Sequence, residues 1–311
     1  MASGKSAIPF KILDGGLATE LEQRGHNLKD ELWSSRLLLD QPEEIVDLHC
    51  KFLEAGSDIV TSASYQATIA GFERIGLERK RAAAMIVRSV ELAREACQRF
   101  EGKIEGRAGE VAAGVGPFGA ALADGSEYTG DYSASKRQLY DFHIERWELL
   151  VSAQPDWMLC ETVPNLQEAE VLCKIAAKTS IPVWISFCCP DGTKISDGTP
   201  IGGLAELIAS AGVHGIGVNC TSPKYISELV HRIRDVSEDL PIVVYPNSGE
   251  TFQSETRDWA GEADAGDFAT QAEAWYQAGA QIIGGCCRTT PEHIRRLRGM
   301  RAAQHVDLGS R

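Results

Sequence analysis

The 311-residue chain lacks the long apolar runs of membrane proteins. No stretch approaches the roughly 18–20 apolar residues that cross a bilayer, and residues 1–10 lack the apolar segment of a secretory signal. Basic residues are also few, with 31 Lys and Arg against 44 Asp and Glu, a net charge of −13. An acidic surface matches neither nucleic acid nor an anionic membrane face. We therefore expect a cytoplasmic protein without such partners.

Linkers and low-complexity tracts are absent as well. Hydrophobic residues make up 43% of the chain, which is enough for a sizeable core. We expect one domain over residues 1–311, with its core from about residue 8 to 300. The polar segment 247–266 is expected to be an extended loop, and residues 301–311 a frayed tail. No zipper or other dimer element is evident, so a monomer is the default expectation.

A helix-then-strand unit recurs along the sequence. An amphipathic helix ends at Gly or another turn residue, and a short strand that is apolar throughout follows it. Such strands are typical of a parallel sheet covered on both faces. Four clear copies are FLEAGSDIVTSAS (52–64), LLVSAQPDWMLCET (149–162), LIASAGVHGIGVNC (207–220) and WYQAGAQIIGGCC (275–287).

This unit predicts eight strands. They lie near residues 10–14, 58–62, 111–115, 156–160, 183–187, 215–219, 242–245 and 281–285. Eight alternating units in about 300 residues fit a single-domain (β/α)8 TIM barrel. A doubly wound open sheet is the alternative, but its usual G-x-G-x-x-G is missing, since the first turn reads Asp14-Gly15-Gly16-Leu17.

Local signals also predict three helix boundaries. Residues 40–43 indicate a helix with an acidic first turn, running to Gly56. Asn165 and Glu168 have the spacing of a capping box. Pro291 should occupy the first position of the last helix.

Five of the nine cysteines follow predicted strands, and three of them lie after the sixth and eighth. Cys220 ends the sixth strand, and Cys286 and Cys287 end the eighth. A barrel brings the carboxyl ends of its strands to one face, where these thiols can converge. Adjacent residues of a strand point to opposite sides, so both members of the pair reach one metal only where the backbone turns. Gly284-Gly285 gives the chain that freedom.

Three thiolates with one open position are typical of a catalytic zinc site. The alternative is that these thiols are small core side chains, as we interpret the cysteines elsewhere in predicted helices and strands. These are Cys50, Cys97, Cys160 and Cys173. The pair Cys188-Cys189 ends the fifth strand, beside the sixth, and spacing alone leaves both open as ligands.

Several motifs together resemble the homocysteine S-methyltransferases. They are ILDGGLATELEQRG (12–25), SDIVTSASYQAT (57–68), GPFGAALADGSEYTGDY (116–132), CETVPN (160–165), SDGTP (196–200), GVNC (217–220), VVYPNSGE (243–250) and GGCCRTTPEHI (284–294). The similarity is greatest to the single-domain bacterial and plant enzymes that use S-methylmethionine. It implies a TIM barrel whose one Zn2+ is bound by Cys220, Cys286 and Cys287, without Cys188 or Cys189.

The resemblance further implies that Asp14 and Glu161 bind the amino group of homocysteine. Carboxylates in a barrel mouth suit an ammonium ligand. The alternatives are a helix N-cap or Asx turn for Asp14 and a solvated loop residue for Glu161. Gly15, Gly16 and Thr162 are weaker candidates for backbone contacts to the substrate.

The methyl donor is expected to lie near two further loops. Tyr65 and Gln66 follow the second strand, and residues 124–128 follow the third. Tyr128 offers an aromatic face to a sulfonium, although both segments fit ordinary surface loops as well. S-Adenosylmethionine is a candidate second donor, and selenohomocysteine a candidate acceptor. Betaine stays open, although betaine-dependent relatives are typically longer, and the folate-dependent ones carry additional domains.

Other functions fit the sequence less well. Gly284-Gly285 lies where some barrels bind phosphate, but Arg288 is the one nearby cation. A Schiff-base aldolase needs a Lys at a strand end, and Lys194 lies several residues beyond the fifth strand. A non-catalytic redox sensor or zinc store would use the same cysteine pairs.

Overall fold

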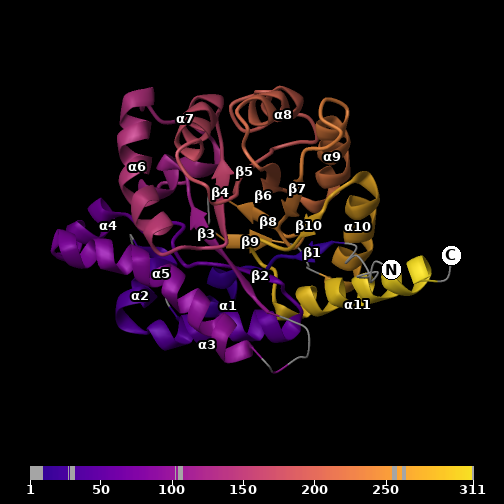
Figure 1. The fold of residues 1–311 in the computed structure, drawn as a ribbon, viewed down its shortest axis with the longest axis horizontal. Helices are drawn as coiled ribbons and strands as arrows, with labels where there is room; N and C mark the ends of the chain where they lie inside the picture. The colour runs from indigo at the N-terminus through magenta and orange to yellow at the C-terminus, as the bar shows by residue number, and fades with distance from the viewer. Residues whose placement is uncertain are drawn as a thin grey trace, which may run out of the picture.

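The computed structural model describes residues 10–26, 28, 32–101, 103, 108–253, 258–260 and 264–309. Eight parallel strands lie at the centre of the molecule, with helices around them (Figure 1). The strands are β1 (Lys11–Ile12), β2 (Ile59–Thr61), β3 (Glu110–Val115), β4 (Trp157–Val163), β5 (Val183–Phe187), β6 (Gly215–Asn219), β7 (Ile242–Tyr245) and β10 (Ile282–Ile283). Each overlaps the segment predicted for it.

The sheet closes into a barrel. The strand order is β1-β10-β7-β6-β5-β4-β3-β2, which leaves β1 and β2 at the two ends. These ends meet, because Leu13 and Ile59 form a parallel bridge and the Asp58 N–H donates to the Ile12 carbonyl at 2.7 Å. The predicted (β/α)8 barrel is therefore confirmed, and the open doubly wound sheet is excluded.

At least one α-helix follows every barrel strand. The helices are α1 (Leu17–Gln23), α2 (Leu37–Asp40), α3 (Pro42–Ala55), α4 (Ile69–Arg74), α5 (Arg79–Phe100), α6 (Lys136–Ser152), α7 (Leu166–Ala176), α8 (Ile201–Ser210), α9 (Ile226–Arg234), α10 (Ala265–Ala278) and α11 (Pro291–Gly309). Short 3-10 turns are η1 (Trp33–Arg36), η2 (Phe118–Ala121), η3 (Ser126–Tyr128) and η4 (Pro223–Tyr225). Across the described residues, no helix combines the length and apolar character needed to cross a bilayer.

Two apolar clusters account for the uniformly apolar strands. One fills the barrel interior and the other lies mainly between strands and helices. The interior cluster contains Leu13, Ile59, Ala112, Leu159, Trp184, Val243, Tyr245 and Ile282. Strands buried on both faces need apolar side chains at every position, which is why no alternation was visible in the sequence.

The predicted turns at the ends of the four repeated helices have a common geometry. Gly56, Gly212 and Gly279 have φ values of 140°, 67° and 117°, and Gln154 has 53°. A residue with positive φ lets the chain leave a helix and enter the next strand. The predicted boundaries of α3 and the start of α11 at Pro291 are confirmed as well.

The segment after β7 differs from its prediction. Residues 247–266 contain an antiparallel pair, β8 (Thr251–Gln253) with β9 (Asp258–Ala260), rather than only an extended loop. A two-stranded ribbon needs few apolar residues, so its sequence reads as a polar loop. Residues 254–257 and 261–263 lie outside the described part of the chain.

The predicted frayed tail is wrong for residues 301–309, because α11 continues to Gly309. Arg301 holds the helix to the barrel seam, pairing with Asp58 and donating to the Phe10 carbonyl at 3.3 Å. Gln304 donates to Glu273 of α10 at 2.9 Å. These contacts are tertiary and had no local sequence signal. Residues 310–311 are outside the described part.

Only half of the predicted capping box forms at α7. The Asn165 side chain accepts from the Glu168 N–H at 2.9 Å. The Glu168 carboxylate is turned instead toward other elements, where it accepts from the Phe118 N–H at 2.7 Å.

Candidate active site

Three thiols meet at the carboxyl end of the barrel. Cys220 directly follows β6, and Cys286 and Cys287 lie beyond the end of β10. The Cys220 Sγ is 2.8 Å from that of Cys286 and 4.0 Å from that of Cys287. All three Sγ atoms lie within 4.8 Å of one another, which is close enough for one metal ion. They form the one such Cys, His or carboxylate group in the described residues.

Backbone contacts hold the cysteine pair in a turn. The Gly285 N–H donates to the Asp14 carbonyl at 3.0 Å, and the Cys286 N–H donates to the Pro246 carbonyl at 2.8 Å. The Cys287 carbonyl accepts from the Ser248 N–H at 3.1 Å. A Cβ on Gly284 would lie 2.7 Å from that of Leu13, so a larger residue there would collide with β1. The expected bend is therefore present, but the turn lies at Cys287-Arg288 rather than at the two glycines, and it brings both thiols to the side of Cys220.

Three non-glycine residues around the thiols have positive φ. Thr162, Cys220 and Arg288 have values of 59°, 46° and 65°. Such conformations cost free energy and persist where surrounding contacts fix them. Here Asn219 is fully buried, donates to the Thr162 hydroxyl at 2.8 Å and accepts from the Thr162 N–H at 2.9 Å. The Thr162 hydroxyl lies 3.7 Å from the Cys220 Sγ.

Asn219 was missed in the sequence. The available signal was a polar residue at the end of an otherwise apolar strand. The sequence interpretation considered only the adjacent Cys220. A buried amide of this kind must find partners, and its partners here fix the loop that carries Cys220.

The pKa values of the clustered thiols are shifted in different directions. Hydrogen bonding to Cys286 and then to Cys287 raises the pKa of Cys220 well above its usual value. Hydrogen bonds from Cys220, from Cys286 and, to a smaller extent, from Tyr128 hold the pKa of Cys287 well below its usual value. Three thiolates this close repel one another, so a bound cation is needed to ionise all of them.

Two carboxyl groups lie beside the thiols. Asp14 is 3% exposed, and burial raises its pKa to about 7 against the opposing hydrogen bonds from Thr61. Burial first, and then the negative charges of Cys286 and Asp14, raise the pKa of Glu161 well above its usual value. Glu161 accepts no hydrogen bond from any residue that the structure describes. An arriving ammonium would reverse both shifts and satisfy both groups.

Asp14 is neither a helix cap nor part of an Asx turn. Its two oxygens accept from the Thr61 N–H at 2.8 Å and the Thr61 hydroxyl at 3.0 Å, which joins β1 to β2. Glu161 has room because Gly114 stands opposite, where a Cβ would lie 2.5 Å from the Glu161 Oε1.

Comparison with known proteins identifies the family to which this site belongs. The sequence model of the family described as "Homocysteine S-methyltransferase" matches residues 11–300. The chain belongs to the homocysteine S-methyltransferase family. It is 44% identical to homocysteine S-methyltransferase 4 of Zea mays, over 96% of this chain and 91% of that protein. It is 41% identical to homocysteine S-methyltransferase YbgG of Bacillus subtilis, over 93% of each.

A solved structure agrees. The metallated form of the homocysteine methyltransferase MmuM from Escherichia coli superposes with a TM-score of 0.84. The two chains are 40% identical, over 94% of this chain and 96% of that one. The chain is therefore an S-methyltransferase enzyme with the barrel of its family, and its thiol cluster lies in a fold that has a metallated relative.

Of the candidate backbone donors in this methyltransferase, two are already engaged. The Gly16 N–H donates to the Thr289 hydroxyl at 3.0 Å, and the Thr162 N–H donates to Asn219. Gly15 is packed tightly, because a Cβ there would lie 2.8 Å from the Phe52 ring. The N–H groups of Gly16 and Thr162 therefore hold Thr289 and Asn219 in place beside the site.

The donor-side candidates lie on two loops at the same end of the barrel. Burial, and then the negative charge of Cys220, raise the pKa of Tyr65 well above its usual value. Tyr128 as a whole is 37% exposed, but desolvation of its hydroxyl, and then the negative charges of Cys287 and Cys220, raise its pKa well above the usual value. Gln66 donates from Nε2 to the Ala120 carbonyl at 3.0 Å, which ties the two loops together. The structure thus brings both tyrosines to the thiol cluster.

A buried charged group anchors the loop that carries Tyr128. Glu168, His143 and Arg146 are at most 3% exposed. Glu168 Oε1 lies 2.6 Å from the His143 Nε2, and Oε2 accepts from the Tyr132 hydroxyl. Together with the Phe118 N–H, these contacts hold both ends of the loop between β3 and α6. The spacing from Asn165 predicted only a local capping role for Glu168, because no sequence pattern indicates its contacts with a distant loop.

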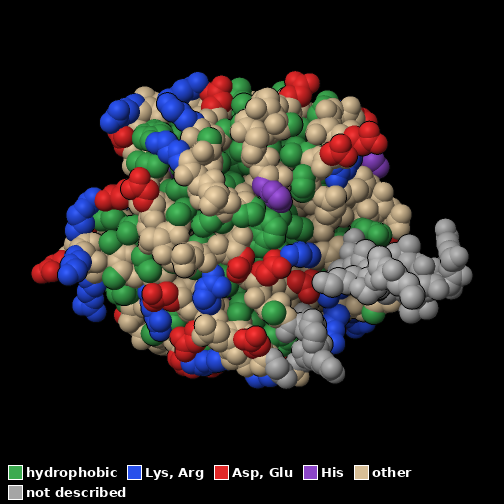
Figure 2. All heavy atoms as spheres, in the orientation of Figure 1, with side chains coloured by type: hydrophobic (Ala, Val, Ile, Leu, Met, Phe, Trp, Pro, Cys, Tyr) green, Lys and Arg blue, Asp and Glu red, His purple; other side chains and the backbone are tan. Residues whose placement is uncertain are grey.

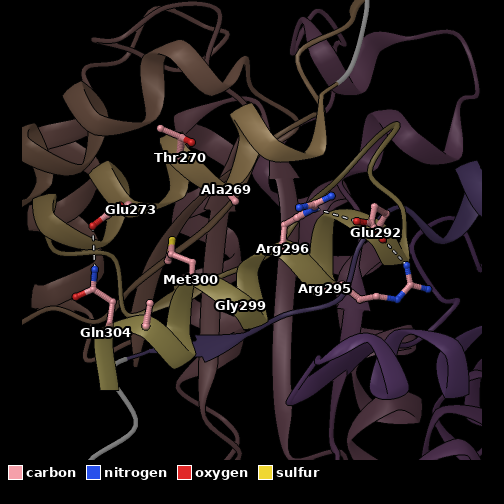
Figure 3. A pocket seen from close by; sticks show the side chains of 10 residues that line it. Ala269, Thr270, Glu273, Glu292, Arg295, Arg296, Gly299, Met300 and Gln304 are labelled. Atoms are coloured by element: carbon pink, nitrogen blue, oxygen red, sulfur yellow. Dashed lines mark hydrogen bonds and ion pairs between the residues drawn. The ribbon is translucent and has the colours of Figure 1, made fainter. Parts of the chain in front are cut away.

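A hollow of about 650 Å³ lies elsewhere, between α10 and α11 (Figure 3). Its charged side chains already pair, Glu273 with Gln304 and Glu292 with both Arg295 and Arg296. None of the predicted site residues lines it.

Proposed function

We propose that this enzyme transfers a methyl group from S-methylmethionine to the thiolate of homocysteine, using one Zn2+ held by Cys220, Cys286 and Cys287. The observation that carries the proposal is the convergence of three thiols beside Asp14 and Glu161. The thiols offer a soft site for a metal and the carboxyl groups offer a site for an ammonium.

The donor set fits zinc. A tetrahedral site with sulfur at about 2.3 Å separates its sulfurs by about 3.8 Å, and the observed separations of 2.8 and 4.0 Å lie on either side of this value. Three protein ligands leave one position for the substrate. When bound, zinc supplies the Lewis acidity that removes the proton from the homocysteine thiol near neutral pH.

The protein orients the acceptor through two buried carboxyl groups that have no cationic partner among the described residues. Asp14 and Glu161 bind the homocysteine ammonium, and this fixes where its sulfur lies relative to the cysteines. A free thiol has a pKa of about 8.5 and is mostly protonated at neutral pH, so placing and ionising this sulfur is a main task of the site. Gly15 and Thr162 line the acceptor side.

The transfer itself balances without a general base. The homocysteine sulfur forms the new C–S bond with its own electron pair. The electrons of the breaking C–S bond stay on the donor sulfur, which changes from a sulfonium to a neutral thioether. Both products are methionine. The anionic cysteine cluster favours a cationic donor, and alignment of the two sulfurs contributes much of the rate.

Tyr65, Gln66 and Tyr128 line the donor side, where the tyrosine rings face a sulfonium. S-Adenosylmethionine, another sulfonium, is the proposed second donor. We further propose that the protein acts in the cytoplasm as a monomer, without nucleic acid or a membrane as partner. Figure 2 shows basic side chains scattered among acidic ones over the face in view, rather than gathered into a basic patch that would attract nucleic acid or an anionic membrane.

Methionine formation tests the proposal. The zinc-loaded protein is incubated with homocysteine and either S-methylmethionine, S-adenosylmethionine or betaine. Turnover with S-methylmethionine that is lost on chelation and restored by zinc supports both donor and metal. Turnover with betaine alone overturns the donor, and chelator-resistant turnover overturns the metal. Absence of turnover with every donor favours the non-catalytic zinc or redox function.

A further inference from the structure

Glu127 is a buried acid in the loop between β3 and α6, and the mechanism above does not use it. It lies in η3 and is 8% exposed. Its Oε2 is buried and has no hydrogen-bond partner among the residues that the structure describes, and no described cation forms an ion pair with it. A buried carboxylate oxygen without a partner is costly, so Oε2 calls for a partner that arrives with a ligand.

The loop around Glu127 is fixed by other contacts. The Ser126 N–H donates to Asp124 at 3.0 Å, and the Tyr128 N–H donates to the Gly125 carbonyl at 3.1 Å. A Cβ on Gly119 would lie 2.5 Å from the Glu127 nitrogen, so η2 packs closely on η3. The Glu127 carboxylate is therefore held in place without contributing an ion pair of its own.

This carboxylate lies on the donor side of the thiol cluster. Its negative charge contributes to the raised pKa values of Tyr65, Tyr128 and Cys188, although burial is the largest cause for each. The same groups respond to the metal-binding thiols. No described cysteine sulfur lies within hydrogen-bond distance of Glu127, so the carboxylate does not contact the thiol cluster directly.

A second unsatisfied acceptor lies on the adjoining loop. Gln66 donates to Ala120 of η2, while its Oε1 is buried and has no hydrogen-bond partner in the described part of the chain. Two acceptors without donors call for a ligand group rich in N–H. A sulfonium carries no N–H group, whereas the ammonium of an amino acid carries three. In S-methylmethionine that ammonium is three carbons from the sulfur, which suits an acid set back from the thiols.

From this geometry we infer that Glu127, assisted by Gln66 Oε1, binds the α-ammonium of the methyl donor. The inference rests on the proposed sulfonium donor and deepens it. The site then has two ammonium subsites: Asp14 and Glu161 beside Cys286 for the acceptor, and Glu127 beside the tyrosines for the donor. Glu127 thereby selects amino-acid sulfonium donors over methyl donors that lack N–H groups, betaine included.

Steady-state kinetics with two donors test this. The donors are S-methylmethionine and its desamino analogue, 4-dimethylsulfoniobutanoate. The wild type should prefer the amine-bearing donor by about ten- to a hundred-fold in kcat/KM, the range for one charged hydrogen bond. Glu127→Gln should raise the KM for S-methylmethionine by a similar factor. It should leave the KM for homocysteine, the zinc content and turnover of the desamino donor nearly unchanged.

Two variants serve as controls. Glu127→Asp keeps the charge and should restore part of the donor affinity. Asp131→Asn removes an exposed negative charge from the same loop and should behave as wild type.

Several results would overturn the inference. They are equal use of both donors by the wild type, equal loss with both donors in Glu127→Gln, and a rise in the KM for homocysteine. If the wild type turns over neither sulfonium, the proposed function fails and this subsite fails with it. If the wild type uses S-methylmethionine but Glu127→Gln keeps its KM, only the subsite fails.

Discussion

At the scale of single residues, the proposed metal site can be tested by comparing a cysteine of the thiol cluster with one outside it. Cys286 contacts Cys220 and lies beside Asp14 and Glu161, as their raised pKa values indicate. Cys50, by contrast, is a half-buried thiol of α3 remote from the cluster, with its Sγ 3.7 Å from the Ala96 carbonyl. The two cysteines therefore form a matched pair for substitution.

Cys286→Ser should abolish stoichiometric zinc binding and methionine formation, because a hydroxyl is a poor soft-metal ligand. Zinc content by atomic absorption and turnover with S-methylmethionine measure the two effects. Cys50→Ser is the control and should retain both. Survival of zinc binding or of activity in Cys286→Ser would count against the proposed ligand set.

Gly114 illustrates how a missing side chain shapes the acceptor side. A Cβ at this position would lie 2.5 Å from the Glu161 Oε1 and 3.2 Å from the Thr61 Cγ2. Gly114→Ala should displace Glu161 and raise the KM for homocysteine by about tenfold or more, the cost of weakening one charged hydrogen bond. The donor KM should change little.

Gly203→Ala is the matched control for this substitution. Gly203 lies in α8, and no heavy atom lies within 4 Å of a Cβ placed there. Its alanine variant should keep wild-type kinetics and gain slight stability, as helix interiors favour alanine. Unchanged homocysteine KM in Gly114→Ala would mean that Glu161 does not bind the acceptor.

At the scale of secondary-structure elements, α3 contains a group that makes the fold sensitive to acid. His49 is fully buried, and neither ring nitrogen has a hydrogen-bond partner among the described residues. Burial lowers its pKa to about 4 from 6.5. Below pH 6.5 the unfolded chain binds a proton that the folded chain refuses until about pH 4. The stability that neutral His49 contributes is therefore present above pH 6.5 and is lost as the pH falls toward 4.

We expect the free energy of unfolding to fall by about 2 kcal/mol from this group between pH 7 and pH 5. Urea unfolding at the two pH values measures the change. His49→Gln cannot titrate and should show a correspondingly smaller difference. An identical difference in wild type and variant would assign the acid sensitivity to other groups.

Helix α11 packs across the place where β1 and β2 meet and close the barrel. Arg301 pairs with Asp58, whose carboxylate also accepts from the Ile12 N–H at 2.8 Å. Their side chains are only 12% and 17% exposed, so the pair is shielded from solvent. Loss of one partner leaves the other partly buried and uncompensated.

Arg301→Ala should lower the free energy of unfolding by about 2 kcal/mol, less than the 3–5 for a fully buried pair. Arg295→Ala is the control, since its pair with Glu292 has side chains 58% and 47% exposed. The control should cost less than about 1 kcal/mol. Equal costs in urea unfolding would mean that the seam does not depend on α11.

At the scale of the whole molecule, we expect the fold to persist without the proposed metal. The barrel closes through backbone bonds between strands, and two apolar clusters fill its interior and its outer layer. The thiol cluster lies at the end of this framework. A small zinc-dependent domain unfolds without its metal because it has no such core.

Removal of zinc should therefore abolish methionine formation while the far-ultraviolet circular dichroism stays that of the folded barrel. The thermal midpoint should fall by only a few degrees, because a ligand stabilises through binding to the folded state alone. Zinc added back should restore activity. Loss of the helical signal on chelation would show instead that the metal is part of the fold.

The sequence alone determined the architecture, because its signals are local. Apolar strands at regular spacing and turn residues after each helix predicted all eight barrel strands and the start of α11. The cysteines at two strand ends predicted the convergence of thiols, since a parallel barrel brings those ends to one face. The family resemblance then assigned Asp14 and Glu161 their expected role.

Only the tertiary structure decided which polar groups are paired and which are free. Glu168 had the spacing of a local cap, yet its carboxylate holds a loop that begins 50 residues earlier. Residues 301–309 contain neither a helix-ending residue pattern nor an apolar face that would predict packing. Contacts with Phe10, just before β1, and with α10 hold this part of the helix to the barrel. Asn219 was overlooked, and Glu127 was not singled out within the predicted donor-side loop 124–128, because burial and the presence of a partner depend on side chains distant in sequence, which local patterns do not encode.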